Sequence, residues 1–297
     1  MNAILQSVQL PNGETIAYRK RAGGEETICL VHGNMISSYH WDIMFDHFDD
    51  RYTLIAPDLR GQGKSSYVNP INSLNDFAND LKAFVDTLKL PIFHLMGWSM
   101  GGGIAMQFAS TYASHVNKLI LVSSMSTRGY PFFKVNAFGK TDYRKRLKSK
   151  EEIKNDRARY IPISNAYESK NTAFLEQILN VTMYPVNKPK RSRYRAYLKD
   201  ILQQRNLLEV YNAMNRFNIS HQSNGVVEGT KEVDKIHAPT LLLWGDKDVI
   251  VSREMQEEII QDFNGRANMR ILKNVGHSPL IDDFTSFERE VLQFLTA

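Results

Sequence analysis

Six short apolar segments recur along the chain and are separated by longer segments of mixed polarity. Each has four to six residues, nearly all of them apolar, and turn-forming residues follow most of them. Such runs are typical of parallel strands that are buried on both faces of a sheet. The predicted strands are Thr27–Val31, Thr53–Ala56, Phe93–Met96, Lys118–Val122, Pro239–Trp244 and Asn268–Leu272.

The segments between these strands show the spacing of amphipathic helices. In Ser73–Leu88, apolar residues recur at positions 74, 77, 78, 81, 84, 85 and 88, which is a helical period. The alternation of strands and helices predicts an α/β fold with an open, doubly wound, mostly parallel sheet. At the N-terminal end, Leu5–Leu10 and Glu14–Arg21 flank Pro11-Asn12-Gly13, which predicts an antiparallel hairpin at one edge of that sheet.

Residues 127–230 interrupt this alternation. They lack apolar strand runs, and they contain helical patterns at Asn171–Leu179 and Tyr194–Met214. We interpret 127–230 as a mostly helical cap that is inserted into a core made of 1–126 and 231–297. Because ligands bind at the carboxyl edge of an α/β sheet, where such insertions lie, the cap is a candidate lid.

The net charge of residues 127–230 differs in sign from that of the rest of the chain. Residues 127–230 carry 20 Lys and Arg against 9 Asp and Glu, a net charge of +11, whereas the remainder carries −6. A basic cap would attract an anionic substrate or surface, but a solvated surface rich in lysine and arginine explains the same counts. No nucleic-acid-binding module accompanies the basic run at 188–195, so no nucleic-acid partner is expected.

Several classes of protein are excluded by composition. Cys29 is the only cysteine, which excludes a disulfide framework, and the eight histidines show no metal-ligand spacing. We therefore expect no metal and no organic cofactor. The longest apolar stretches are too short to span a membrane, and the N-terminus lacks the pattern of a secretion signal, so a cytoplasmic protein is expected. The oligomeric state is not indicated.

The segment after Phe93–Met96 carries the clearest chemical signal. Gly97-Trp98-Ser99-Met100-Gly101 has the form G-x-S-x-G and lies between a predicted strand and a predicted helix. A strand that turns into a helix within about one residue forces its central residue into a strained conformation. The small glycines allow that turn, which presents the Ser99 hydroxyl at the carboxyl edge of the sheet, next to a helix N-terminus.

A serine hydroxyl needs a general base, and the base needs an acid that orients it. His277 follows the last predicted strand, and Asp248 follows the strand Pro239–Trp244. The order Ser99, Asp248, His277 is that of the α/β-hydrolase triad, and all three follow strands at the same edge of the sheet. Asp246 competes for the acid role, but its place directly after Gly245 favours a turn-stabilising function.

The chain resembles the α/β-hydrolase superfamily, in particular its esterase-like members with a helical cap. The resemblance covers about residues 5–122 and 236–294. It rests on the motif around Ser99 and on four others, which are Val31-His32-Gly33-Asn34, Ala56-Pro57-Asp58-Leu59-Arg60-Gly61-Gln62-Gly63-Lys64-Ser65, Gly245-Asp246-Lys247-Asp248 and Gly276-His277. The Gly63-Lys64-Ser65 ending is not a phosphate-binding loop, because that pattern requires glycine where the chain has Asp58.

The resemblance implies roles for further residues. The backbone N–H groups of Asn34 and Met100 would form the oxyanion hole, and His32 would support the loop that carries Asn34. Trp98 and Trp41 are candidate substrate-binding residues, although Trp41 is equally explained as a core residue. The related haloalkane dehalogenases and epoxide hydrolases carry an aspartate in place of Ser99, which argues against both of these activities.

The sequence therefore predicts a serine hydrolase that cleaves a carboxylic ester or a related acyl compound through an acyl-enzyme. The same triad would also serve hydrolysis of a lactone, thioester, amide or carbon–carbon bond, because fold alone does not fix the substrate. A small-molecule receptor with little turnover is a third interpretation. The expected partner is a small acyl compound, whose identity the sequence does not reveal.

Overall fold

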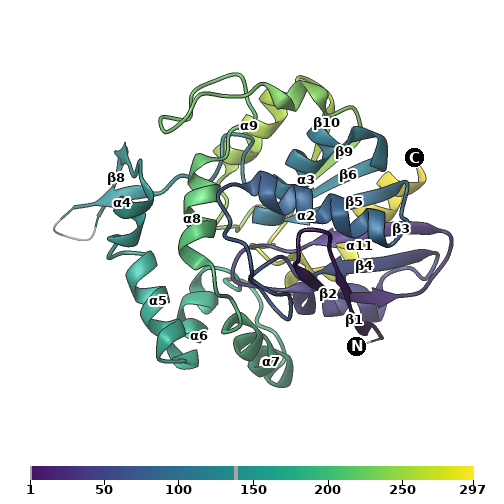
Figure 1. The fold of residues 1–297 in the computed structure, drawn as a ribbon, viewed down its shortest axis with the longest axis horizontal. Coiled ribbons are helices and arrows are strands. Elements are labelled where there is room, and N and C mark those ends of the chain that lie inside the picture. The colour runs from purple at the N-terminus through teal and green to yellow at the C-terminus, as the bar shows by residue number, and fades with distance from the viewer. Residues whose placement is uncertain (1, 137–139) are drawn as a thin grey trace.

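Eight strands form one mixed sheet in the computed structural model, which describes residues 2–136 and 140–297 (Figure 1). The strand order is β1-β2-β4-β3-β5-β6-β9-β10. The strands are β1 (Ile4–Gln9), β2 (Thr15–Arg21), β3 (Glu26–Val31), β4 (Tyr52–Pro57), β5 (Phe93–Trp98), β6 (Val116–Val122), β9 (Thr240–Gly245) and β10 (Ala267–Leu272). All six apolar segments are strands, so this part of the sequence prediction is confirmed.

The first two strands form the predicted edge hairpin. Strand β1 pairs antiparallel with β2, and β2 pairs antiparallel with β4, whereas every other pair in the sheet is parallel. Gly13 has a φ of 87°, a conformation that glycine adopts without a steric penalty, and the Leu10 N–H donates to the Glu14 carbonyl at 2.7 Å. The turn therefore follows from the Pro-Asn-Gly sequence.

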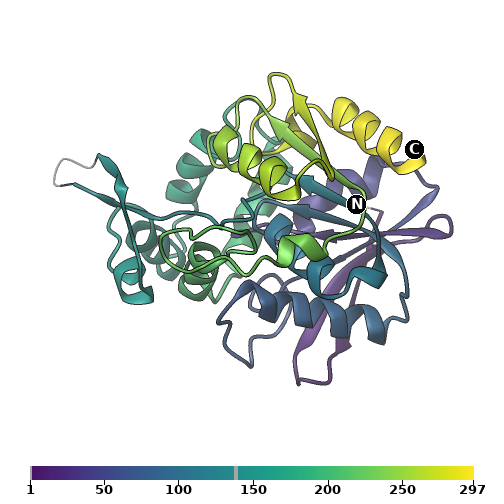
Figure 2. The ribbon, with the colours of Figure 1, turned by 90° about the horizontal axis from the view of Figure 1, so that it is seen from above.

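Burial along the strands explains why their sequences are apolar. Every residue of β5 and of β9 is buried, whereas β1 is exposed along most of its length. Helices α2 and α3 cover one face of the sheet and α11 covers the other, as Figure 2 shows. The central strands are thus shielded from water on both sides, as the apolar runs predict.

Helices make up most of the regular secondary structure outside this sheet. The predicted helix at 73–88 is α2, in which the Asp76 carboxylate accepts the Ser73 N–H at 2.9 Å and so satisfies a free donor at the helix start. The core helices are α1 (Asp42–His47), α2 (Leu74–Thr87), α3 (Met100–Thr111), α9 (Arg253–Phe263), α10 (Pro279–Asp282) and α11 (Phe284–Thr296). None of the helices in the described part of the chain is long and apolar enough to cross a membrane.

The segment between β6 and β9 contains the predicted helices and also a hairpin that apolar runs did not reveal. Its elements are β7 (Phe133–Val135), β8 (Thr141–Arg146), α4 (Lys150–Lys154), α5 (Tyr160–Glu168), α6 (Thr172–Val181), α7 (Arg191–Ile201) and α8 (Leu207–Arg216). Strands β7 and β8 pair antiparallel, and no residue in either strand is fully buried, so no apolar pattern marks them. The boundaries 127 and 230 of the cap stay a prediction.

The pattern at Tyr194–Met214, which we interpreted as one helical stretch, divides into α7 and α8. The break coincides with contacts to the core: the Arg205 N–H donates to the Gly61 carbonyl, and the Asn206 amide donates to the Arg60 carbonyl, both at 2.8 Å. Each helix buries apolar residues at a spacing of three or four, so the sequence pattern alone does not show where one helix ends and the next begins. Tertiary contacts therefore accompany a corner that periodicity does not show.

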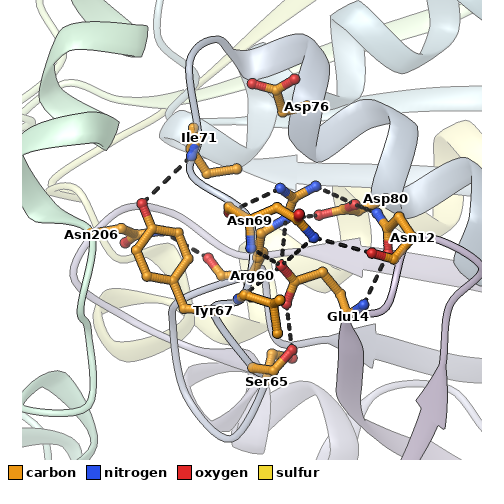
Figure 3. Close-up of polar contacts among 12 residues, drawn as sticks. Asn12, Glu14, Arg60, Ser65, Tyr67, Asn69, Ile71, Asp76, Asp80 and Asn206 are labelled. Atoms are coloured by element: carbon orange, nitrogen blue, oxygen red, sulfur yellow. Dashed lines mark hydrogen bonds and ion pairs between the residues drawn. The ribbon is translucent and has the colours of Figure 1, made fainter.

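The turn after β4 is attached to a buried polar cluster that includes Glu14, Arg60 and Asp80 (Figure 3). Arg60 donates to the Asp80 carboxylate at 2.7 Å through Nε, and the same Nε lies 3.6 Å from Oε1 of Glu14. Glu14 is fully buried and accepts N–H groups from Val68 and Asn69. Burial raises the pKa of Glu14, but the hydroxyl of Ser66 and these N–H groups outweigh it, and the net pKa is lowered. The cluster therefore holds two carboxylates around one guanidinium.

Candidate active site

Ser99 lies at the turn from β5 into α3 and has φ 58° and ψ −120°. This is a rare conformation for a residue other than glycine. The neighbouring glycines are required by space: a Cβ on Gly97 would lie 2.2 Å from the Gly101 carbonyl oxygen, and a Cβ on Gly101 would lie 2.2 Å from the Val31 carbonyl oxygen. The G-x-S-x-G spacing therefore corresponds to a tight strand–turn–helix.

Hydrogen bonds hold the strained turn in place. The Ser99 N–H donates to the Val122 carbonyl at 2.9 Å, and the Ser99 carbonyl accepts N–H groups from Gly102 and Met125 at 3.0 and 3.2 Å. Gly33, at the end of the neighbouring strand β3, packs directly against Ser99, since a Cβ there would lie 3.0 Å from the serine Cβ. The main chain around Ser99 is thus fixed by β3, β6 and α3.

His277 and Asp248 meet on the loops that follow β10 and β9. Nδ1 of His277 lies 2.8 Å from Oδ2 of Asp248, and both side chains are buried. The other carboxylate oxygen of Asp248 accepts the N–H groups of Ile250 and Val251 at 2.9 and 3.0 Å. These bonds stabilise an ionised carboxylate, which in turn orients an Nδ1–H tautomer of His277.

The competing carboxylate, Asp246, has a different partner. Its Oδ1 accepts the Asn274 N–H at 2.7 Å, and its own N–H donates to the Leu272 carbonyl. Asp246 therefore joins the loops after β9 and β10 and does not contact the imidazole. The acid role of Asp248 stays a prediction.

Two further side chains hold the loop that carries His277. The indole N–H of Trp98 donates to the His277 carbonyl at 2.9 Å, and the carboxylate of Asp282 accepts the Gly276 N–H at 2.7 Å. Burial raises the pKa of Asp282, although the N–H donors of Gly276 and Asn187 oppose that shift. Asp282 was not predicted as a site residue, since nothing in the sequence marks an acid five residues after the histidine as its support.

Trp98 and Trp41 pack edge to face, with ring centroids 5.6 Å apart. Both are almost fully buried, at 1% and 0% exposure. Trp98 thus contacts the His277 loop from within the core, and the role of either indole in binding substrate stays a prediction.

Ser99 Oγ forms no hydrogen bond with His277, or with another side chain, in the described part of the chain. Ser99 is partly exposed, and its neighbour Trp98 holds the His277 main chain. Hydrogen bonds between a nucleophile and its base are often long in unliganded enzymes and shorten when substrate binds. The arrangement thus brings together Asp248 and His277, with the Ser99 turn beside the His277 loop.

Two backbone N–H groups next to Ser99 lack an acceptor among the residues described. The N–H of Met100 is the first of α3, where intrahelical partners are missing, and the N–H of Asn34 follows the end of β3. His32 supports the Asn34 loop: Nε2 accepts the Leu59 N–H at 2.9 Å, which places the proton on Nδ1, and Nδ1 donates to the Gly33 carbonyl at 2.8 Å. Burial lowers the pKa of His32, so the ring is neutral at pH 7.

The Asn34 side chain has a partner that sequence reasoning missed. Gln204, in the segment between β6 and β9, donates through Nε2 to Oδ1 of Asn34 at 2.8 Å. The two residues are 170 positions apart, and no motif or periodicity connects them. Only a folded structure reveals this contact.

Cavity size does not identify the site. Clefts of about 540 and 590 Å³ lie on the surface, one between α2, α3 and residues 213–232 and one around His221 and Arg266, and neither is lined by Ser99, Asp248 or His277. Within the described ranges, no group of three or more His, Cys, Asp or Glu side chains has an arrangement that could hold a metal ion. The chemistry of the loops after β5, β9 and β10 therefore defines the candidate site.

A profile of the family described as the alpha/beta hydrolase fold matches residues 26–284, which is most of the chain. The chain belongs to the α/β-hydrolase family. This α/β-hydrolase is 23% identical over 297 residues to 2-hydroxy-6-oxononadienedioate/2-hydroxy-6-oxononatrienedioate hydrolase 1 of Pseudomonas putida, covering 97% of this chain and 95% of that protein. It is 25% identical over 279 residues to the hydrolase with that activity from Escherichia coli O139:H28, covering 92% and 88%.

Solved structures share the fold of this α/β-hydrolase. An esterase from Exiguobacterium antarcticum superposes with a TM-score of 0.75 at 18% identity, covering 99% of this chain and all of that one. A bromoperoxidase from Bacillus anthracis superposes with a TM-score of 0.74 at 20% identity and similar coverage. The protein is therefore a hydrolase of the α/β-hydrolase family, and the predicted fold class is confirmed.

Proposed function

We propose that this hydrolase cleaves a carboxylic ester by way of an acyl-enzyme on Ser99. The observation that carries the proposal is the buried 2.8 Å contact between His277 Nδ1 and Asp248, on a loop that Trp98 ties to the strained Ser99 turn. A histidine that is oriented by a carboxylate can act as a general base. A serine on a strand–helix turn is the type of nucleophile that such a base deprotonates.

The proposed reaction assigns one step to each of these residues. Nε2 of His277 removes the Ser99 proton while Oγ attacks the ester carbonyl carbon, and Asp248 stabilises the imidazolium that forms. The negative oxygen of the tetrahedral intermediate accepts the N–H groups of Asn34 and Met100. Each such donor typically lowers the barrier by about 3 kcal/mol. His277 then protonates the departing alkoxide, and water activated by the same imidazole releases the acid.

A second candidate is hydrolysis of a carbon–carbon bond. It is favoured by the relatives from Pseudomonas putida and Escherichia coli, which align over nearly the whole chain and whose names specify hydrolysis of 2-hydroxy-6-oxononadienedioate and the corresponding trienedioate. Those substrates are dicarboxylates, and the positive charge of 127–230 would attract them. Comparing turnover of a vinylogous 1,5-diketo acid with that of simple esters separates the two candidates.

A fluorophosphonate probe followed by peptide mass analysis tests the proposal without assuming a substrate. We expect Ser99 to carry the label, and we expect Ser99→Ala to abolish both labelling and hydrolysis of p-nitrophenyl butyrate. Ser110→Ala is the matched control, because Ser110 lies near the other end of α3 and its hydroxyl donates to the Gln107 carbonyl. Binding of ligand without Ser99-dependent turnover would instead support a receptor.

A further inference from the structure

The turn between α7 and α8 contacts the loop that carries Asn34 and the loop that follows β4. We call residues 200–206 the α7–α8 corner. Its hydrogen bonds to the core join Ser37 Oγ to Asp200 Oδ2 at 2.7 Å, Gln204 Nε2 to Asn34 Oδ1 at 2.8 Å, Arg205 N–H to the Gly61 carbonyl at 2.8 Å, and Asn206 Nδ2 to the Arg60 carbonyl at 2.8 Å. The corner is therefore fixed to the loops after β3 and β4.

Asn34 lies in a loop whose backbone is under constraint. The next residue, Met35, has a φ of 65°, which is unusual for a residue other than glycine. On the core side, His32 holds the peptide of Gly33. On the other side, the side chain of Asn34 is held by Gln204, so the peptide that carries the Asn34 N–H is anchored from both directions.

The orientation of the Gln204 amide is set by three neighbours. Nε2 faces Oδ1 of Asn34 at 2.8 Å and Oδ1 of Asn206 at 3.3 Å, while Oε1 accepts the hydroxyl of Tyr167 at 3.3 Å. Gln204 is 7% exposed. A buried amide with both ends engaged is rigid, and hydrogen bonds are stronger where water is excluded. Gln204 can therefore transmit the position of the α7–α8 corner to Asn34.

We propose that Gln204 is a positioning residue that aims the Asn34 N–H at the developing oxyanion. The inference rests on the proposed function, since it assigns a role to Gln204 in stabilising the same tetrahedral intermediate. A donor that turns away from the oxyanion stabilises the transition state less and leaves binding of the flat ester unchanged. The segment between β6 and β9 thereby contributes to the chemical step.

A merely structural role for Gln204 makes different predictions. If the amide only attaches the α7–α8 corner to the core, its loss lowers thermal stability or raises KM, and transition-state binding falls no more than substrate binding. A trifluoromethyl ketone distinguishes the two roles. It adds to Ser99 as a hemiketal whose oxygen occupies the oxyanion hole, so its affinity reports the aim of the Asn34 N–H directly.

The experiment is a double-mutant cycle of Gln204→Met, Asn34→Ala and the double variant, assayed with p-nitrophenyl butyrate and a butyl trifluoromethyl ketone. Methionine keeps the length of the side chain and removes the amide, and Asn34→Ala keeps the backbone N–H. We expect kcat to fall about tenfold in each single variant, KM to change little, and ketone affinity to fall by the same factor as kcat. The double variant should lose no more than either single variant.

Gln177→Ala, on the exposed side of α6, is the matched control and should behave as wild type. Additive losses in the double variant, or an unchanged affinity for the ketone, would overturn the positioning role. If Gln204→Met does not fold, Asn34→Ala tests the same contact from its more exposed end. Absence of Ser99-dependent hydrolysis would refute the proposed function, and comparing wild type with Ser99→Ala reveals it before the Gln204 and Asn34 variants are assayed.

Discussion

The indole N–H of Trp98 donates to the main-chain carbonyl of His277, 179 positions away in the sequence, at 2.9 Å. Trp98 immediately precedes Ser99, so one side chain links the turn of the proposed nucleophile to the loop of the proposed base. The bond is buried, and leaving a buried carbonyl without its donor typically lowers the free energy of unfolding by about 1 to 3 kcal/mol. The separation between the Ser99 turn and the His277 loop therefore depends on this contact.

Trp98→Phe should lower kcat for p-nitrophenyl butyrate about tenfold, because the His277 loop loses its fixed distance from Ser99. It should also lower the free energy of unfolding by more than Trp41→Phe does. Trp41 is equally buried, but its Nε1 has no hydrogen-bond partner among the described residues, so that variant loses indole volume alone. Equal destabilisation by the two substitutions would show that the Trp98 hydrogen bond contributes nothing.

Asp248→Asn should reduce kcat about 10⁴-fold, because the amide no longer holds the imidazole in the tautomer that accepts the serine proton. The fold should persist, since the amide oxygen still accepts the N–H groups of Ile250 and Val251. Asp246→Asn makes the same change two residues earlier and should leave kcat within about tenfold of wild type. Steady-state kinetics with both variants decide which carboxylate serves the histidine.

His32 makes stability depend on pH near neutrality. Burial lowers its pKa below the ordinary value of 6.5, and its Nε2 must stay unprotonated to accept the Leu59 N–H. As pH falls through 6.5, the unfolded chain binds a proton that the folded chain does not, so the free energy of unfolding decreases. The slope approaches about 1.4 kcal/mol per pH unit for one such group.

Urea titrations between pH 7.5 and 5.5 measure this loss. Burial also lowers the pKa of His94, so the comparison with His94→Gln isolates the share of His32. We expect stability to decline with falling pH in both proteins, and more gently in the variant. A free energy of unfolding that stays constant across this range in His94→Gln would contradict a neutral, buried His32.

Arg60→Met should lower the free energy of unfolding by about 3 to 5 kcal/mol, because it leaves two buried carboxylates, Asp80 and Glu14, without their cation (Figure 3). Arg191→Met is the control. Arg191 also pairs with a carboxylate, that of Glu176 at 2.9 Å, but its side chain is 68% exposed, and such pairs contribute about 0 to 1 kcal/mol. Chemical denaturation of both variants gives the comparison.

The parts of the structure that sequence predicted share a short-range physical cause. Burial on both faces makes a strand apolar, and the strand–helix turn at Ser99 requires its flanking glycines, so both leave a local pattern. The pairing of Asp248 with His277 was predicted because each follows a strand of a parallel sheet, which places both at the same edge, and because their order matches the α/β-hydrolase triad; β9 and β10 are neighbours in the structure. These features therefore needed no knowledge of distant contacts beyond the order of strands.

The features that were missed depend on contacts between distant segments. The hairpin of β7 and β8 has no buried face, and the break between α7 and α8 coincides with bonds to Arg60 and Gly61. Nothing in the sequence distinguishes Gln204 from other polar residues of its helical pattern, and only the fold brings it into contact with Asn34. One-dimensional periodicity carries no record of such pairings, so no refinement of it would have found them.

Strands β6 and β9 lie next to each other in the sheet, with Leu119 opposite Thr240, although more than a hundred residues of chain leave and return between them. The hydrogen bonds that join β6 to β9 are made within these two strands and do not involve the inserted segment. The segment between β6 and β9 can therefore vary in length and sequence without disturbing the hydrogen bonds between these strands, as long as the α7–α8 corner still contacts Asn34. For protein engineers, the segment between β6 and β9 is therefore an exchangeable module, and residues 200–206 are the part to keep in any chimera.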